Sequence, residues 1–345
     1  MTATHPSRNG SLRTPGGRGV RIIGTGRHAP QTVWDNDRLR EFMDTSDEWI
    51  RQRTGIASRH VCDPDRGETT RTLATKALTN AIEDAKISPR EIDLVIVATI
   101  SGETTCPATA CRVAADAGAS GAGAFDLLAA CSGFVYGMNV AHDLIKGGNY
   151  NTIAVIGCDA MSRIIDFSNR TVGILFGDAA GAAILRASGD PAHGLVCSAM
   201  HADGSNWHDL YLPHHEADLP DGLSAEDVPI GTLQMQGKKI YKFAVGRFPA
   251  LIQKTLDNAG LAPDQVDHYI CHQSNARMLE SARDRVGIPE HKLPINIDRY
   301  GNCSGGSVPV LLDELRKDGK CNAGETVMFV AFGAGLTWGS SLWKL

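Results

Sequence analysis

The chain has 345 residues, of which 42% are hydrophobic and 21% are charged, and it carries a formal net charge of −5 at pH 7. A chain of this size can bury one large core or two fused ones, and its acidic balance offers no general attraction for nucleic acid. No stretch approaches the roughly 18 consecutive apolar residues of a membrane-spanning helix, and the N-terminus lacks the apolar core of a signal peptide. We expect a globular protein with a disordered tail over residues 1–20, without nucleic-acid or membrane partners.

A succession of predicted elements occurs twice in the sequence. Residues 81–97, AIEDAKISPREIDLVIV, predict the end of an amphipathic helix, a turn at Pro89 and a buried strand. Residues 255–271, TLDNAGLAPDQVDHYIC, repeat this succession, and an offset of 174 places Pro89 on Pro263. The offset is half the chain, so the sequence predicts a duplicated unit.

The predicted strands of both copies are apolar throughout. They are DLVIVATI (93–100), TIAVIGC (152–158) and ETVMFVAF (325–332). Strands of this kind are covered on both faces, and their alternation with helices predicts a layered α/β fold with largely parallel sheets. Glycine-rich segments, LFGDAAGAAILRA and AFGAGLTWGSSLWKL, predict a hairpin-like end for each half.

Each half also contains a Cys-Ser-Gly turn before a helix. In the first half GAFDLLAA precedes Cys131, and in the second INIDRYGN precedes Cys303, so the two cysteines are expected in nearly equivalent turns. A thiol at the first turn of a helix faces unpaired N–H groups and the positive end of the dipole, which lowers its pKa. Either cysteine could be a nucleophile or a small buried hydrophobic residue, and the turn alone leaves both open. The nine cysteines form no C-x-x-C pair, which indicates a reducing compartment.

Two further side chains are candidates for chemistry beside a thiol. His272 follows a predicted strand at its carboxyl end, where it could move a proton or be satisfied by backbone carbonyls. Asn302 stands at a tight turn and could aim an N–H₂ donor or only shape the turn. The histidines of HADGSNWHDLYLPHHE, at 201, 208, 214 and 215, are weaker candidates, and without a ligand spacing they predict no metal site.

Exposed helices supply two candidate binding surfaces. Thr45 and Glu48 predict a capping box that begins a helix displaying Trp49, Arg51 and Arg53. Three lysines at 238, 239 and 242 follow a helical pattern, and Arg277 follows His272 by five residues. Both sets could equally be solvated faces.

Several long motifs occur in order: DTSDEWIRQRTGI, FDLLAACSGF, LFGDAAGAA, ICHQSNARM, GNCSGGSVP and FGAGLTWGS. Through them the chain, from about residue 20 to 345, closely resembles β-ketoacyl-acyl-carrier-protein synthase III, the initiating condensing enzyme of fatty-acid synthesis. The resemblance implies a thiolase-like fold of two layered α/β halves, in the order αβαβα, related by a pseudo-twofold axis. We expect the halves at 21–188 and 241–345, joined by a connecting region at 189–240.

The resemblance implies a triad of Cys131, His272 and Asn302. It favours Cys131 over Cys303, because the family usually has a non-nucleophilic residue at the latter position. The backbone N–H groups of Cys131 and Ala334 are implied as the oxyanion hole, although many relatives have glycine at 334.

The resemblance also implies binding residues. Trp49 and Arg53 are expected to hold the adenine of coenzyme A, with Arg170 as a further nucleotide contact and Asn275 on the pantetheine arm. Lys242 and Arg277 are expected to dock the acidic carrier protein. Cys106 occupies the place of an aromatic residue that reaches across a dimer interface to close the acyl tunnel, so a longer or branched primer is conceivable beside acetyl.

The implied reaction is decarboxylative condensation of acyl-CoA with malonyl-acyl-carrier protein, in a cytoplasmic homodimer without cofactor or metal. The alternatives are a relative that primes a polyketide or alkylquinolone pathway, an acyltransferase acting on alcohols, a non-catalytic partner subunit and a cysteine hydrolase. An intact Cys131 disfavours the partner subunit.

Overall fold

The computed structural model describes residues 17–345, so most of the expected tail lies outside the described residues. The first sheet has the order β1-β7-β6-β4-β5. Its strands are β1 (Gly19–His28), β4 (Leu94–Ala98), β5 (Gly123–Leu127), β6 (Thr152–Asp159) and β7 (Ala179–Ser188). Because β1 begins at Gly19, the last two residues of the expected tail belong to this sheet.

The second sheet has the order β11-β12-β13-β8. Its strands are β8 (Gly194–Ala202), β11 (His268–Cys271), β12 (Thr326–Gly333) and β13 (Thr337–Lys344). Two small ribbons accompany the sheets: β2 (Val33–Asp35) with β3 (Ser58–His60), and β9 (Leu210–Tyr211) with β10 (Gln234–Met235). The edge strand β8 comes from the stretch that the sequence predicted as a connecting region.

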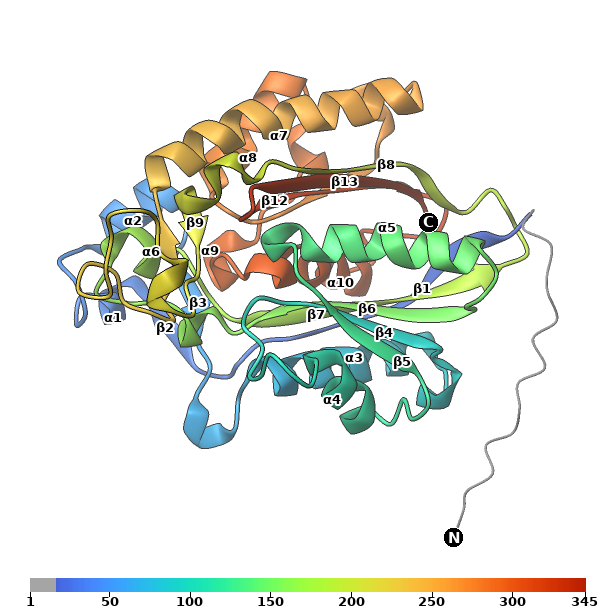
Figure 1. Cartoon of the computed structure of the whole chain (residues 1–345). Coiled ribbons are helices and arrows are strands. Elements are labelled where there is room, and N and C mark those ends of the chain that lie inside the picture. Colours follow the sequence, from blue (N-terminus) through green and yellow to red (C-terminus); the bar gives the residue numbers. More distant parts are fainter. Residues whose placement is uncertain (1–16) are drawn as a thin grey trace, which may run out of the picture.

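Helices complete a five-layer arrangement (Figure 1). The helices α5 (Gly133–Lys146) and α10 (Ser307–Lys317) lie between the two sheets, and their apolar side chains share one core with residues of both sheets. The helices α3 (Thr70–Ala85) and α4 (Thr109–Asp116) cover the outer face of the first sheet. The outer face of the second carries α7 (Gly237–Ala259) and α8 (Ala276–Val286). The predicted αβαβα thiolase-like fold is confirmed.

Short helices gather at one end of the sheets, around the two ribbons (Figure 1). They are α1 (Asn36–Leu39), α2 (Asp47–Thr54), α6 (Arg170–Gly173) and α9 (Ile297–Tyr300). The capping box predicted for α2 from Thr45 and Glu48 is wrong, because the N-cap lies one residue later. Ser46 is the N-cap, and its hydroxyl accepts the Trp49 N–H at 3.2 Å, while the Thr45 hydroxyl is buried without a partner among the described residues.

The offset of 174 recurs in the coordinates. Both ends of β6 and β12 differ by that number, as do the first residues of α5 and α10. Ala130 and Ser304, the residues that open the 3₁₀ turns before these helices, have φ of 47° and 48°. An uncommon left-handed conformation at non-glycine residues in both places indicates that one local structure was duplicated.

The expectation of largely parallel sheets is wrong. The sheets are mixed, because β7 and β13 run antiparallel to both of their neighbours; only β4 with β5 and β6, and β11 with β12, pair in parallel. The second half also lacks a counterpart of β5. Its segment INIDRYGN contains the short helix α9, which is fastened to α10 by hydrogen bonds from Arg299 and Tyr300 to Glu314.

No helix over residues 17–345 combines the length and the apolar composition needed to cross a membrane.

Candidate active site

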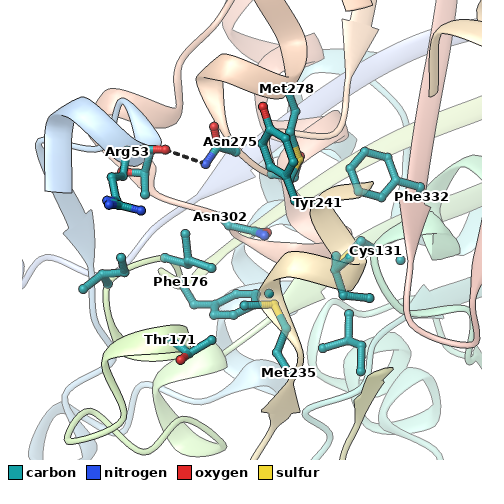
Figure 2. Close-up of a pocket in the computed structure, with 18 of the residues that line it drawn as sticks. Arg53, Cys131, Thr171, Phe176, Met235, Tyr241, Asn275, Met278, Asn302 and Phe332 are labelled. Carbon is teal, nitrogen blue, oxygen red and sulfur yellow. Dashed lines mark hydrogen bonds between the residues drawn. The ribbon is translucent and has the colours of Figure 1, made fainter. Parts of the chain in front are cut away.

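A cavity of about 380 Å³ lies where the two halves meet. Cys131 from the first half and His272 and Asn302 from the second all line it. Figure 2 shows Cys131 and Asn302 on its wall, with Tyr241 and Phe332 nearby. The structure therefore brings together the three side chains that the sequence nominated for the triad.

Cys131 is held at the start of α5 by the turn Ala130–Ser132. The close approach of Gly333, the last residue of β12, fixes the position of this turn. A Cβ on Gly333 would lie 2.7 Å from the Cys131 backbone nitrogen and 3.0 Å from its Cβ. Only glycine permits this contact without movement of the backbone, so β12 sets the position of the nucleophile candidate.

The pKa of the Cys131 thiol is not lowered, contrary to the expectation from its helix position. Burial raises that pKa to about 12, and hydrogen bonding from Ser304 opposes the rise only in part. Because the side chain is only 8% exposed, loss of water around the charged form outweighs the helix dipole. Cys131 is therefore a neutral thiol at physiological pH.

His272 follows β11 directly and is 1% exposed. Its backbone N–H donates to the Val330 carbonyl at 2.8 Å, and its ring stands edge-on to Phe332 with centroids 5.6 Å apart. Burial lowers the pKa of the imidazole to about 3. His272 is therefore neutral at physiological pH and free to accept a proton. Its Nδ1 atom has no hydrogen-bond partner among the described residues.

Asn302 has its amide orientation fixed by the backbone. Its Oδ1 accepts the Ser304 N–H at 2.8 Å, and its own backbone is bonded to Leu175 and Gly177. Since a backbone N–H can only donate, the oxygen must face Ser304 and the N–H₂ group must face the other way. Figure 2 shows the nitrogen end on the side of Cys131. Asn302 thus presents a donor to the cavity.

Cys303 is not equivalent to Cys131. The offset of 174 places Gly305 opposite Cys131, and the turn Ser304–Gly306 matches Ala130–Ser132. The Cys303 sulfur points to the Tyr300 carbonyl at 3.4 Å, and the residue does not line the cavity. Burial raises the pKa of its thiol well above the usual value. The two Cys-Ser-Gly strings therefore do not correspond in the duplicated turns, because Cys303 lies two residues before the position that matches Cys131.

Ala334 follows Gly333 and does not itself line the cavity, so its backbone N–H as an oxyanion donor stays a prediction. Gly333 and Leu336 line the wall on either side of it.

Aromatic and basic side chains lie at the opening of the cavity. The guanidinium carbons of Arg170 and Arg53 lie 4.1 and 4.8 Å from the centre of the Trp49 ring. Asn275 caps α8 through the Arg277 N–H, and its N–H₂ group donates to the Arg53 carbonyl at 2.9 Å (Figure 2). The four residues predicted to contact coenzyme A therefore lie together.

The remaining predicted residues lie outside the cavity. Lys242 on α7 and Arg277 on α8 are exposed, each next to residues that line the cavity, such as Tyr241 and Met278. Cys106 is exposed in the loop after β4 and does not line the cavity of the single chain described.

Sequence reasoning missed the apolar wall of the cavity. Much of it comes from the stretch predicted only as a connection and from the start of α7: Leu210, Met235, Ile240, Tyr241 and Phe243. The spaced apolar residues in this glycine- and proline-containing stretch were the available signal. An apolar wall suits the hydrocarbon part of a substrate.

One group of potential metal ligands exists over residues 17–345: His268, Cys321 and Glu325, away from the cavity. His268 Nε2 lies 3.0 Å from Glu325 Oε2, so a hydrogen bond already accounts for two of these side chains. None of the four histidines between 201 and 215 belongs to such a group.

Two duplicated halves in five layers, with a cysteine, a histidine and an asparagine around one cavity between them, define a thiolase-like condensing enzyme. Residues 125–204 match the family model described as 3-oxoacyl-[acyl-carrier-protein] synthase III, and residues 256–345 match its C-terminal model. The β-ketoacyl-[acyl-carrier-protein] synthase III of Caldanaerobacter subterraneus subsp. tengcongensis is 40% identical over 323 residues, which are 94% of this chain and 97% of that protein. The chain belongs to the β-ketoacyl-acyl-carrier-protein synthase III family, and it is an acyltransferase of the condensing type.

Solved structures agree with this assignment. The 3-oxoacyl-[acyl-carrier-protein] synthase III of Aquifex aeolicus superposes with a TM-score of 0.87 and 37% identity, covering 95% of this chain and 100% of that one. The priming β-ketosynthase of a polyketide biosynthetic pathway superposes with a TM-score of 0.88 and 32% identity, covering 97% of this chain and 99% of that one.

Proposed function

We propose that the protein joins an acyl-CoA primer to malonyl-acyl-carrier protein, releasing coenzyme A and CO₂ and forming 3-oxoacyl-acyl-carrier protein, the first condensation of fatty-acid synthesis. The observation that carries the proposal is that Cys131, His272 and Asn302 line one cavity. Trp49 lies at the opening of the same cavity. Acetyl is the default primer. No metal or other cofactor takes part in this chemistry.

The first half-reaction transfers the acyl group to Cys131. The thiol sulfur attacks the thioester carbonyl while its proton passes to neutral His272, and collapse of the tetrahedral adduct expels coenzyme A, which takes that proton. The backbone N–H groups of Cys131 and Ala334 stabilise the oxyanion. Because the pKa of the thiol is about 12 and that of the imidazole about 3, proton transfer accompanies attack rather than preceding it.

The second half-reaction breaks and forms a carbon–carbon bond. Malonyl-acyl-carrier protein loses CO₂, and the electron pair is held as an enolate whose oxygen accepts hydrogen bonds from His272 and the Asn302 amide. The enolate carbon attacks the acyl thioester of Cys131, and the departing sulfur takes a proton from solvent. Incubating the protein with acyl-CoA and malonyl-acyl-carrier protein should yield one CO₂ and one coenzyme A per condensed product; coenzyme A release without CO₂ would contradict the reaction.

Trp49 is proposed to stack on the adenine of coenzyme A, with Arg53 and Arg170 as its cationic neighbours. Both guanidinium groups lie within 5 Å of the ring centre, so an adenine that stacks on Trp49 would bind beside two cations. Asn275 would then contact the pantetheine arm on its way to Cys131.

Lys242 and Arg277 are proposed to dock the acidic carrier protein beside the opening. Both are exposed on neighbouring helices that also line the cavity. Reversing both charges should raise the KM for malonyl-acyl-carrier protein and spare that for acyl-CoA, and an unchanged KM would reject this surface.

A homodimer is proposed to form along β5. This strand is an edge of its sheet, and Phe125 and Leu128 on it and just after it are 38% and 81% exposed. Pairing of two copies would cover these side chains and the free edge, and it would bring Cys106, in the loop after the adjacent β4, near the partner. Leu128→Glu should convert a dimer to a monomer in analytical ultracentrifugation. All nine cysteines are unpaired, which supports a cytoplasmic location.

A polyketide-priming role is the second candidate, because the priming β-ketosynthase superposes on this chain with a TM-score of 0.88. Comparing condensation rates for acetyl and longer acyl-CoA primers separates the two, since a fatty-acid enzyme of the default kind favours acetyl.

A further inference from the structure

Ser304 connects the nucleophile candidate with the amide donor. The Cys131 thiol donates to the Ser304 hydroxyl, with 3.5 Å between the sulfur and the oxygen, and the Ser304 backbone N–H donates to Asn302 Oδ1. Ser304 is fully buried and holds a left-handed φ of 48°. A single turn therefore touches two of the three triad side chains.

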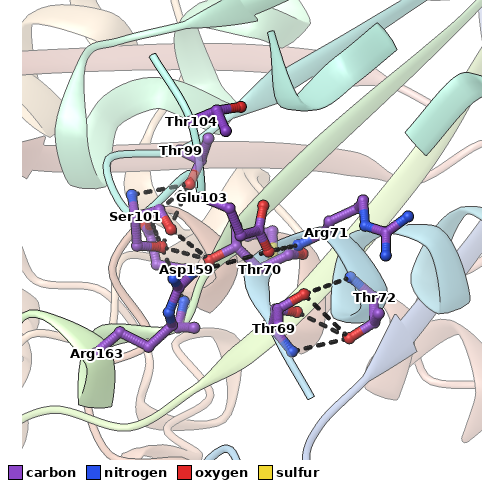
Figure 3. A network of polar contacts seen from close by, with 12 residues as sticks. Thr69, Thr70, Arg71, Thr72, Thr99, Ser101, Glu103, Thr104, Asp159 and Arg163 are labelled. Atoms are coloured by element: carbon purple, nitrogen blue, oxygen red, sulfur yellow. Dashed lines mark hydrogen bonds and ion pairs between the residues drawn. The ribbon is translucent and has the colours of Figure 1, made fainter. Parts of the chain in front are cut away.

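A buried carboxylate fastens this turn from behind. Asp159, the last residue of β6, is fully buried, and its Oδ2 accepts the Gly305 N–H at 3.2 Å. Its Oδ1 accepts three further hydrogen bonds, at 2.8 to 2.9 Å, from the Thr99 hydroxyl, the Ile100 N–H and the Ser101 hydroxyl (Figure 3). Backbone N–H groups bond both oxygens, which is the pattern of an ionised carboxylate.

The turn has little room to move. A Cβ on Gly157 of β6 would lie 2.1 Å from the Gly305 carbonyl oxygen, so strand and turn are in close backbone contact. Burial raises the pKa of Asp159, while hydrogen bonds that include one from the Ser304 side chain lower it. Strand β6, Asp159 and Ser304 thus form one packed unit under Cys131.

We propose that Ser304, anchored by Asp159, is a positioning residue of the reaction: its hydroxyl sets the side-chain orientation of Cys131 and its backbone N–H sets the amide of Asn302. The inference rests on the proposed role of Cys131 as the nucleophile. Ser304 bonds to the Cys131 thiol but forms and breaks no covalent bond in the reaction, and it acts by orienting the two side chains that it holds.

Ser304 and Asp159 shift the pKa of the Cys131 thiol in opposite directions. Ser304 accepts the S–H of the neutral thiol, and when the thiol ionises its hydroxyl can turn to donate to the thiolate, which lowers the pKa of Cys131, whereas the negative charge of Asp159 raises that pKa. His272 also lines this cavity and is uncharged there, and the other titratable residues that line it are Tyr241, Arg53 and Arg170. Substitutions that only loosened the fold would change the reactivity of the thiol in the same direction at both positions. Opposite changes at Ser304 and Asp159 would therefore indicate the proposed roles.

The test measures the rate at which iodoacetamide alkylates Cys131, identified by peptide mapping, at one mildly alkaline pH. Below the pKa of the thiol this rate follows the thiolate fraction. Ser304→Ala should slow alkylation roughly fivefold, because the thiolate loses one hydrogen bond. Asp159→Asn should accelerate alkylation, because a negative charge near the thiolate is removed. Ser304→Ala should also slow acylation by acyl-CoA while sparing decarboxylation of malonyl-acyl-carrier protein, because the backbone N–H that orients Asn302 remains.

Cys303→Ser is the matched control, because it alters the same buried turn at a side chain that points away from the cavity. It should leave both rates unchanged. An unchanged alkylation rate in Ser304→Ala, or a change in the same direction in both variants, would overturn the inference. If Asp159→Asn does not fold, the Ser304→Ala result decides alone. Failure of acyl-CoA to acylate Cys131 in the unaltered protein would instead refute the proposed function, and the alkylation rates would still be measurable.

Discussion

Gly333 and Cys131 are in backbone contact across the interface of the two halves. The end of β12 lies so close to the turn before α5 that a single added carbon on Gly333 would stand 2.7 Å from the Cys131 nitrogen. The nucleophile candidate is therefore positioned by a strand from the opposite half of the chain. The contact also brings the β12 end next to the backbone N–H that is proposed to bind the oxyanion.

Gly333→Ala should reduce acylation of Cys131 by about a hundredfold, because a backbone shift of an ångström at a reacting group costs about that much. Single-turnover acylation with acyl-CoA measures the effect. Gly189→Ala is the control, since a Cβ there meets nothing within 4 Å. Equal rates in both variants would show that the contact does not position the thiol.

Asn302→Ala should separate the two half-reactions. Removal of one donor to the enolate lowers the condensation rate by about 10² to 10³, while self-acylation of Cys131 stays largely intact. The two rates are measured as product formed with malonyl-acyl-carrier protein and as acyl-enzyme formed without it. A similar loss in both would argue that Asn302 only maintains the shape of the turn.

Trp49→Ala should raise the KM for acyl-CoA about tenfold, because the ring loses its stacking and cation–π contacts with the adenine. The KM for the carrier-bound substrate, which has no adenine, should not change. Arg51→Ala serves as the control, since Arg51 stands on the same helix but pairs with Asp47 at 2.7 Å. A rise for both substrates would point to damage of α2 rather than loss of a nucleotide contact.

The acid sensitivity of folding should depend on His272. Its pKa falls from 6.5 to about 3 on burial, so the folded state holds the neutral ring, and above pH 6.5 the free energy of unfolding does not depend on its titration. Between that pH and about 3 the unfolded state binds a proton that the folded state does not, which costs about 1.4 kcal/mol per pH unit. Denaturant unfolding of His272→Gln should show a smaller loss of stability over this range, and an equal loss would mean that the ring is not buried neutral.

Much of the fold was predictable because apolar strands are local signals and because the offset of 174 repeats one succession of elements along the chain. The sequence analysis matched Cys303 with Cys131 on the repeated Cys-Ser-Gly string, whereas the offset of 174, applied to the turns, places Gly305 opposite Cys131. The mixed strand directions were not predicted, because an apolar strand has the same residue pattern beside a parallel neighbour as beside an antiparallel one. The pKa of Cys131 was predicted in the wrong direction because the helix position is visible in sequence whereas its burial is set by β12 and by Ser304, far away along the chain.

The most direct measurement is mass spectrometry of the protein after incubation with a panel of acyl-CoAs. We expect one acyl group per chain, mapped to Cys131, with release of one coenzyme A and no adduct in Cys131→Ala. An acyl group on any other cysteine, or an adduct that persists in Cys131→Ala, would contradict the assignment of Cys131 as the nucleophile.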